Sequence, residues 1–169
     1  GLTVNGGTFD LNGNSQTISA LAGASGEVAL GSGTLAVNQA VNTSYAGTIT
    51  GSGALIKIGA GTLTLSGANS YSGGTIVNGG LLQGTTTSLQ GSIVNNAVVY
   101  FNQAVTGTYA GVMSGSGSML VTGGGRVILT GNSTYAGGTT VGAGNILQLG
   151  NGGTTGWLTG NVVTNGTLA

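Results

Sequence analysis

One block of sequence occurs twice in this chain, and that repeat is the strongest constraint on the fold. Residues 51–82 read GSGALIKIGAGTLTLSGANSYSGGTIVNGGLL, and residues 115–147 read GSGSMLVTGGGRVILTGNSTYAGGTTVGAGNIL. Equivalent residues such as Leu65 and Leu129 lie 64 positions apart. A repeat of this length is typical of solenoid proteins, in which each structural unit stacks on the next.

The repeat extends beyond the two blocks and divides the whole chain. It predicts a single segment over 1–169, with a partial copy at 1–37 and two further copies at 38–101 and 102–169. The chain is therefore about two and a half copies of one unit, and we expect it to be part of a longer array. The period divides into three coils of about 21 residues, which gives about eight coils in the chain.

The local patterns predict strands and almost no helix. Glycine supplies 38 of the 169 residues, which is too many for long helices. The segment 17–24 is the closest helix candidate, and it is short enough to be one turn or a loop. Apolar residues alternate with small polar ones in several stretches, and Asn-Gly, Ser-Gly and Gly-Gly pairs separate them. These stretches are 2–4, 33–37, 62–65, 98–101 and 126–129.

Two all-β architectures fit this pattern. Asn-Gly turns between short strands are typical of hairpins, and hence of an antiparallel sandwich or barrel. The long repeat instead favours a parallel β-helix, in which matching residues of successive coils form ladders. In a β-helix we expect inward Leu, Ile and Val to form a dry core. We also expect Gly and Asn with positive φ at the corners, and Ser, Thr and Asn hydrogen-bonded along the axis.

The residues of the first block resemble a known family. The run from Gly51 through Leu55, Lys57 and Gly61 to Gly80 is similar to the passenger-associated repeat of bacterial autotransporters. This resemblance implies a right-handed parallel β-helix in a secreted or surface-exposed passenger. The family includes adhesins, proteases, esterases and stalks, so the repeat implies the scaffold and leaves the activity open.

Charge is nearly absent, at 2% of residues, and the four charges cancel. One lysine and one arginine cannot build a basic patch, so we predict no nucleic-acid partner. The spacing of Asp10 and Glu27, 17 positions along the chain, puts them on adjacent coils and makes them the only candidate acid–base pair. The alternative, which we favour, is two solvated carboxylates. Lys57 and Arg126 are predicted to be isolated surface cations.

Other catalytic and metal-binding chemistries lack their residues. The chain has no His and no Cys, so neither a serine-type triad nor a zinc site can form. One Asp cannot supply repeated calcium coils, and no phosphate-binding glycine motif occurs. We therefore predict no enzyme, no catalytic, cofactor-binding or metal-binding residues, and no cofactor. No apolar run of about 18 residues exists, so we expect no membrane insertion.

The aromatic residues are predicted to be structural. Two repeat-matched pairs, Tyr45 with Tyr109 and Tyr71 with Tyr135, are expected to cap coil corners with their hydroxyls in water. Trp157 has no partner in the other copies, and it either packs at an end of the rod or forms an exposed contact. The sequons at Asn42, Asn132 and Asn165 are expected by chance in a chain this rich in Asn and Thr.

These observations favour a structural β-helical rod of a secreted or surface-exposed protein, which serves as a stalk, an adhesin scaffold or an extracellular fibre. The nearest alternative is a filament or biofilm subunit that self-associates head-to-tail through its end coils. Cell-surface or polysaccharide contacts are also open, as are a carbohydrate-active or carbohydrate-binding β-helix and an ice binder. An ice binder would need a Thr-x-Thr row such as that of Thr62 and Thr64 on every coil, and Arg126-Val127-Ile128 breaks such a row.

Overall fold

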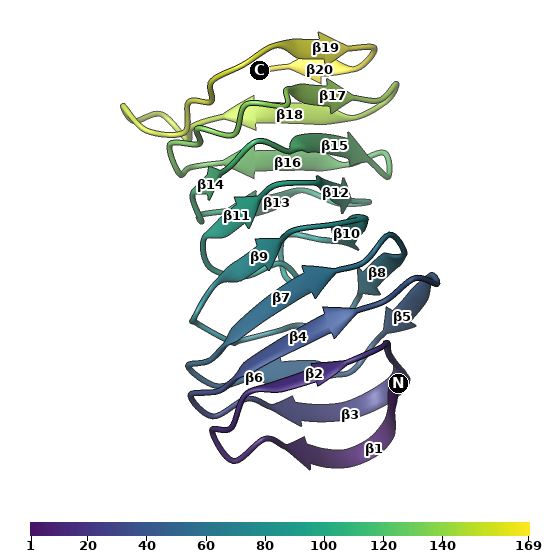
Figure 1. The fold of residues 1–169 in the computed structure, drawn as a ribbon. Coiled ribbons are helices and arrows are strands. Elements are labelled where there is room, and N and C mark those ends of the chain that lie inside the picture. Colours follow the sequence, from purple (N-terminus) through teal and green to yellow (C-terminus); the bar gives the residue numbers. More distant parts are fainter.

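The computed structural model describes residues 1–169 as a stack of coils, with β1 at one end and β19 and β20 at the other (Figure 1). Every strand pairing is parallel, and the structure contains no helix. The prediction of an all-β parallel solenoid is confirmed. Residues 17–24 belong to β2 (Gln16–Ile18) and β3 (Leu21–Ala29) rather than to a helical turn.

Three sheets run along the stack. The first sheet contains β1 (Leu2–Asp10), β3, β5 (Thr43–Tyr45), β8 (Thr62–Leu65), β10 (Leu81–Gly84), β12 (Val98–Asn102), β15 (Ser118–Thr122), β17 (Thr139–Val141) and β19 (Val162–Thr164). The second sheet contains β2, β4 (Thr34–Asn38), β7 (Ala54–Ile58), β9 (Thr75–Val77), β11 (Ile93–Asn95) and β14 (Met113–Ser114). The third sheet contains β13 (Gly107–Tyr109), β16 (Arg126–Leu129), β18 (Ile146–Leu149) and β20 (Thr167–Leu168).

The coil has a third face that changes along the stack. The long strand β3 covers two faces, because β5 pairs with its first half and β6 (Thr48–Thr50) pairs with Glu27–Ala29. The next two coils have no strand after β8 and after β10. The third sheet then begins at β13 and continues on the third face of the later coils. This interruption produces the groove described below.

The strand registers give the length of each coil. Leu55 pairs with Thr75, and a step of the same 20 positions recurs through most of the stack. The step shortens to 17 positions between Leu81 and Val98, and it lengthens to 23 positions between Thr139 and Val162. The chain therefore makes about eight turns, as predicted, and its usual coil is one position shorter than the sequence suggested.

The repeat does not correspond to three whole coils. Strands β4, β7 and β9 lie in the second sheet, whereas their counterparts in the next copy, β12, β15 and β17, lie in the first sheet. Likewise β5, β8 and β10 of the first sheet have β13, β16 and β18 of the third sheet as counterparts. Because three coils of the usual length are shorter than one repeat, each repeat adds one further strand and turn. Successive copies are thus rotated by one face about the axis.

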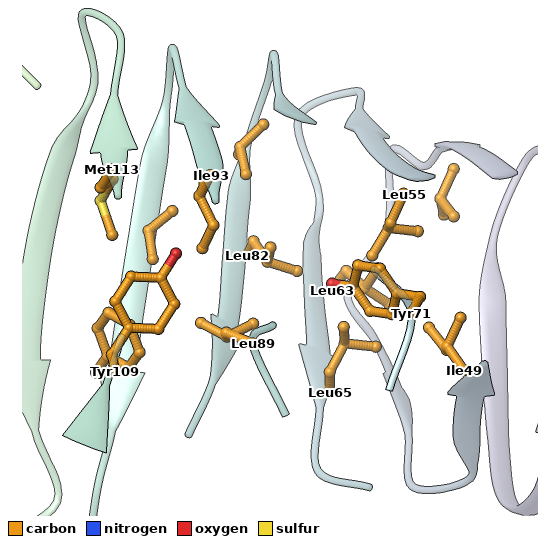
Figure 2. Close-up of a cluster of buried hydrophobic side chains, with 14 of the residues drawn as sticks. Ile49, Leu55, Leu63, Leu65, Tyr71, Leu82, Leu89, Ile93, Tyr109 and Met113 are labelled. Carbon is orange, nitrogen blue, oxygen red and sulfur yellow. The ribbon is translucent and has the colours of Figure 1, made fainter. Parts of the chain in front are cut away.

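Buried and more exposed side chains alternate along the strands, and the buried ones fill the interior with apolar groups. A single cluster of 28 buried residues extends through the stack. Figure 2 shows Leu55 of β7, Leu63 of β8 and Tyr71 of the segment between β8 and β9 pointing into the interior. Inward positions of one coil lie above inward positions of the next, as in the register pair Leu63 and Leu82. The predicted dry core of stacked aliphatic residues is confirmed, and it supplies the main favourable term in folding.

The corners depend on glycine more than on asparagine. Gly51 has φ of 110° and its repeat counterpart Gly115 has φ of 102°, conformations that side chains disfavour. Asn12 is the only non-glycine residue with positive φ, so the expectation that asparagines share this conformation is wrong elsewhere. Asparagine side chains act instead through hydrogen bonds, as when Asn96 Nδ2 donates to Asn78 Oδ1 of the preceding coil at 3.0 Å. This contact fits the expected polar stacking along the axis.

Candidate functional site

The two carboxylates lie on adjacent coils, as their spacing predicted, but they do not form a site. Glu27 is in register with Thr8, and Asp10 is in register with Ala29. Glu27 accepts hydrogen bonds from Thr50 Oγ1 at 2.6 Å and from Thr8 Oγ1 at 3.3 Å. Asp10 accepts from the Asn12 amide at 2.7 Å. Neither residue lines a pocket, so each carboxylate serves its own local hydrogen bonds.

Lys57 is buried, and the prediction of a surface cation is wrong. Its side chain has no exposed surface, and it lies in a ladder between Val37 and Val77. The ammonium group donates to the carbonyl oxygens of Ile58 at 2.9 Å, Gly59 at 2.8 Å and Gly79 at 3.1 Å. Burial lowers the pKa of Lys57, because desolvation disfavours the charged form. The long side chain reaches the turn, so it ties two coils together from inside.

Arg126 is half-buried at the start of β16. Its Nη1 donates to Gln148 Oε1 of the next coil at 3.1 Å. The two cations lie in different sheets and share no partner. The structure contains no group of three or more side chains suited to hold a metal ion.

The repeat-matched tyrosines are core residues with bonded hydroxyls. Tyr71 bonds Thr75 Oγ1 at 2.7 Å, and Tyr135 bonds Thr139 Oγ1 in the same way. Tyr109 donates to the Gly91 carbonyl oxygen at 2.6 Å. The structural role is as predicted, but the expected wet hydroxyls are not observed. The reason is that each hydroxyl finds a partner, within the same corner for Tyr71 and Tyr135 and on the preceding coil for Tyr109, which removes the cost of burying it.

Burial also sets the ionisation of these phenols. Desolvation raises the pKa of Tyr71 to about 12, and the hydrogen bond with Thr75 opposes the rise. Desolvation likewise raises the pKa of Tyr109, with a smaller contribution from Tyr71. The pKa of Tyr45 rises through desolvation and then through the negative charge of Glu27. These phenols are therefore protonated structural groups at neutral pH.

Buried amides at the corners were not singled out as functional from the sequence. Gln39 is fully buried and donates to the carbonyl oxygens of Val41 at 3.1 Å and Thr62 at 2.6 Å. Its repeat counterpart Gln103 accepts from the Thr86 amide at 2.9 Å. No buried side-chain nitrogen or oxygen lacks a partner. The recurrence of Asn-Gln at the same offset in both copies was the available signal.

Trp157 and two of the sequons have distinct environments. Trp157 remains 46% exposed, which fits the alternative of an exposed contact better than full packing. Asn42 Oδ1 accepts from the Thr62 amide at 2.8 Å, and Asn132 Oδ1 accepts from the Gly156 amide at 2.9 Å. Both asparagine side chains thus brace neighbouring coils.

Threonines do not form the regular array that ice binding needs. Thr62 and Thr64 of β8 face outward, but the residues in register on the next coil are Leu81 and Gln83. A further threonine group, 85–87, lies in a turn rather than in a sheet.

One open groove, which we call the third-face groove, is the best candidate for a binding site. It encloses about 620 Å³ on the third face, where the coils after β8 and β10 carry no strand. Its walls come from three successive coils, at Asn69, Thr87 and Thr108, and Leu89 and Tyr109 lie at its base. None of its twelve lining residues is charged. The groove can therefore offer hydroxyls, amides and backbone groups, but no ionic chemistry.

The structure contains no helix that is long and apolar enough to cross a membrane.

Comparison with known proteins gives two concordant matches. The family model described as the passenger-associated-transport-repeat matches residues 55–83 and 121–149, one match in each of the two repeat blocks. The adhesin BmaC autotransporter of Brucella suis biovar 1 (strain 1330) is 37% identical over 175 residues. That alignment covers 88% of this chain but 5% of the adhesin, so the chain spans about one twentieth of that relative's length. No solved structure matches.

Both matches fit the geometry. The family model covers strands β7 to β10 in the first block, and in the second it begins in β15 and covers β16 to β18. Each of these strands in the first block lies in a different sheet from the corresponding strand in the second block. The parallel solenoid, the two family repeats and the similarity to an autotransporter adhesin together show that this chain belongs to the autotransporter passenger repeat proteins.

Proposed function

We propose that this chain is a non-enzymatic structural segment of a secreted or surface-exposed passenger, in which it serves as a rod or an adhesin scaffold. The observation that carries the proposal is the single buried cluster of 28 residues, which runs through the coils without a break. A core of this kind resists bending and local opening, because each coil is packed and hydrogen-bonded to both neighbours.

The arrangement of the charged groups supports a structural rather than a catalytic role. Glu27 and Asp10 are each hydrogen-bonded to their own neighbours, and Lys57 is enclosed by backbone carbonyl groups. General acid–base catalysis requires titratable groups that converge on a substrate site. The third-face groove, in contrast, has an uncharged lining.

The relative's name supports a location outside the cell. The similar protein is named as an adhesin and an autotransporter, and the aligned region covers most of this chain. A segment with few basic residues offers little to proteases that cleave after lysine or arginine, and one of its two basic side chains is fully buried. Such a segment is well suited to a scaffold exposed to the surroundings.

Immunogold electron microscopy of intact cells tests this proposal. The cells produce the full-length protein, and the antibody is raised against residues 1–169. We expect label on unpermeabilised cells, in a band at a constant distance from the outer membrane. An antibody against a periplasmic protein is the control and should label only permeabilised cells. Label from the anti-rod antibody that appears only after permeabilisation would refute the surface location.

We infer a second candidate function, head-to-tail association through the end coils, from the strand order. In this chain β1 has a neighbour on one side only, and the same holds for β19 and β20. Unpaired strand edges accept further strands, from a continuing chain or from another copy. Negative-stain electron microscopy over a concentration series distinguishes the outcomes. Filaments one coil wide at high concentration would support association between copies, and short particles at every concentration would exclude it.

A further inference from the structure

The third-face groove arises from a local contraction of the solenoid. Leu81 pairs with Val98, and this step along the chain is the shortest between neighbouring coils in the first sheet after β8. Part of the missing length is in the turn after β10, because Leu81 to Ile93 spans one position fewer than Thr62 to Thr75, and the rest is between β11 and β12. In the turn after β10 the Thr85 carbonyl oxygen accepts from the amides of Ser88 at 3.2 Å and Leu89 at 3.0 Å. The chain thus takes a shorter path across the third face, and the surface is recessed between the flanking coils.

The contracted turn is rigidly held. The Thr85 amide donates to Ser88 Oγ at 2.7 Å, and Asn69 Nδ2 of the previous coil donates to the Ser88 carbonyl oxygen at 2.7 Å. From the following coil, Gln103 Oε1 accepts from the Thr86 amide at 2.9 Å. Coils on both sides therefore hold the turn in place. A preformed groove loses little conformational entropy when a ligand binds.

The lining indicates what kind of ligand fits. Gln90 Nε2 donates to the Thr87 carbonyl oxygen at 2.8 Å, which leaves its Oε1 as an acceptor. Thr108 and Ser92 are exposed, and their hydroxyls make no hydrogen bond within the chain. A charged ligand would lose hydration without gaining a counter-charge, and a wholly apolar ligand would leave these polar groups unpaired. A neutral molecule rich in hydroxyls avoids both costs.

We propose that the third-face groove binds a neutral oligosaccharide segment, with Thr108, Gln90 and Ser92 as its hydrogen-bonding residues. The volume of about 620 Å³ lies in the range of small-molecule sites, and the groove is open to solvent, so a sugar chain can enter it and leave it. Leu89 and Tyr109 are buried beneath the groove, and the exposed methyl groups of Ala68 and Ala110 supply small apolar contacts for the sugar rings. This site adds to the rod role and does not depend on it.

Nuclear magnetic resonance titration of the purified chain tests the proposal. The probes are neutral hexasaccharides: cellohexaose, maltohexaose, mannohexaose and N-acetylated chitohexaose. We expect at least one to give saturable shifts in the amide signals of 85–92 and 107–111. No saturable shift with any of the four, or shifts confined to other regions, would overturn the proposal. So would equal or stronger binding at the groove of an anionic oligogalacturonate or of an extended uncharged peptide.

Matched variants make the test specific. Ala110→Trp places a large side chain at the groove wall, and it should reduce affinity at least tenfold. Ala104→Trp is the control at another exposed alanine and should leave affinity unchanged. Thr108→Val removes one hydroxyl while keeping the side-chain shape, and should weaken binding severalfold. Amide signal dispersion reports whether each variant is folded. Unchanged affinity in both groove variants would contradict the assignment, and the immunogold experiment on the rod role would be unaffected.

Discussion

Leu65 and Leu129 occupy the same position of the repeat but face the core from different sheets. Leu65 ends β8 in the first sheet and is in register with Tyr45, whereas Leu129 ends β16 in the third sheet and is in register with Tyr109. The leucine is thus paired with an equivalent tyrosine in both copies, although the pair lies on a different face of the coil in each copy. The repeat therefore encodes a strand–turn–strand unit that fits any face of the coil. In a longer array, surface features of the repeat would wind around the rod.

This relationship predicts which deletions the fold tolerates. Removal of 38–101, one full repeat, joins Val37 to Asn102 at equivalent positions of the unit. We expect a shorter solenoid that retains its β-sheet circular dichroism and unfolds cooperatively. Removal of 38–97, which has the length of three usual coils, instead joins β4 directly to β12 and eliminates a turn. That variant should misfold or aggregate, and equal folding of the two deletions would contradict the rotated repeat.

Lys57 should stabilise the fold through its three carbonyl partners. The substitution Lys57→Met keeps most of the side-chain volume but leaves those oxygens without a donor, and we expect a loss of about 1–3 kcal/mol in the free energy of unfolding. Arg126→Met is the control, with one bond lost at a half-buried site, and it should cost less than about 1 kcal/mol. Urea denaturation measures both values.

The lowered pKa of Lys57 adds a pH signature. The unfolded chain holds a proton on Lys57 up to its ordinary pKa of 10.5, and the folded chain releases it at lower pH. In that window the unfolded state binds more protons, so the stability of the native protein rises with pH. The destabilisation by Lys57→Met should therefore be larger at pH 10 than at pH 7. A constant difference at both pH values would argue against a desolvated ammonium group.

The buried phenols should cause unfolding at higher pH. Burial raises the pKa of Tyr71 from 10.0 to about 12, so above pH 10 the unfolded state loses the proton first. Stability present below pH 10 is then lost as the pH rises towards 12. Tyr71→Phe should cost about 1 kcal/mol at neutral pH, because the bond to Thr75 is lost. It should also flatten the alkaline decline in urea denaturation experiments, and an unchanged decline would refute this assignment.

Gly67 illustrates how closely the coils stack. A Cβ atom there would overlap the carbonyl oxygen of Gly47 in the coil below, and its counterpart Gly131 has the same relation to Gly111. We expect Gly67→Ala to destabilise the protein by about 1–3 kcal/mol, because backbone cannot move aside locally. Gly153→Ala, with no atom within 4 Å of the added carbon, is the matched control and should be near neutral. Thermal denaturation distinguishes the two.

The sequence predicted the architecture well because the repeat is long and because apolar and polar residues alternate along the strands. Apolar positions such as Leu63 and Val127 have the period of two that a half-buried strand requires, and both are buried. Coil length was less predictable. The repeat period is compatible with three long coils or with three shorter coils and an extra strand, and only the hydrogen-bonded register decides between them.

The environment of single polar residues was also beyond sequence reasoning. A lysine is expected at the surface because it is charged. Lys57 nevertheless occupies an inward position of β7, because its long side chain can reach the carbonyl groups of the turn. The groove depends on the contraction at Thr85, which has no counterpart in the second copy. Its residues, such as Thr108 and Gln90, carry no motif that marks a binding site.

The most direct test of the account is disulfide trapping across the shortest coil. The chain contains no cysteine, so a pair can be introduced cleanly. Leu81 and Val98 are in register on neighbouring strands, and adjacent strands lie about 4.8 Å apart, which is within reach of a disulfide. A coil of the length expected from the sequence would instead place Leu81 opposite Asn102. We predict that the pair Leu81→Cys and Val98→Cys forms a disulfide under mild oxidation, and that Leu81→Cys with Asn102→Cys does not. Cross-linking of the second pair and not the first would contradict the register on which the solenoid, its rotated repeat and its groove depend.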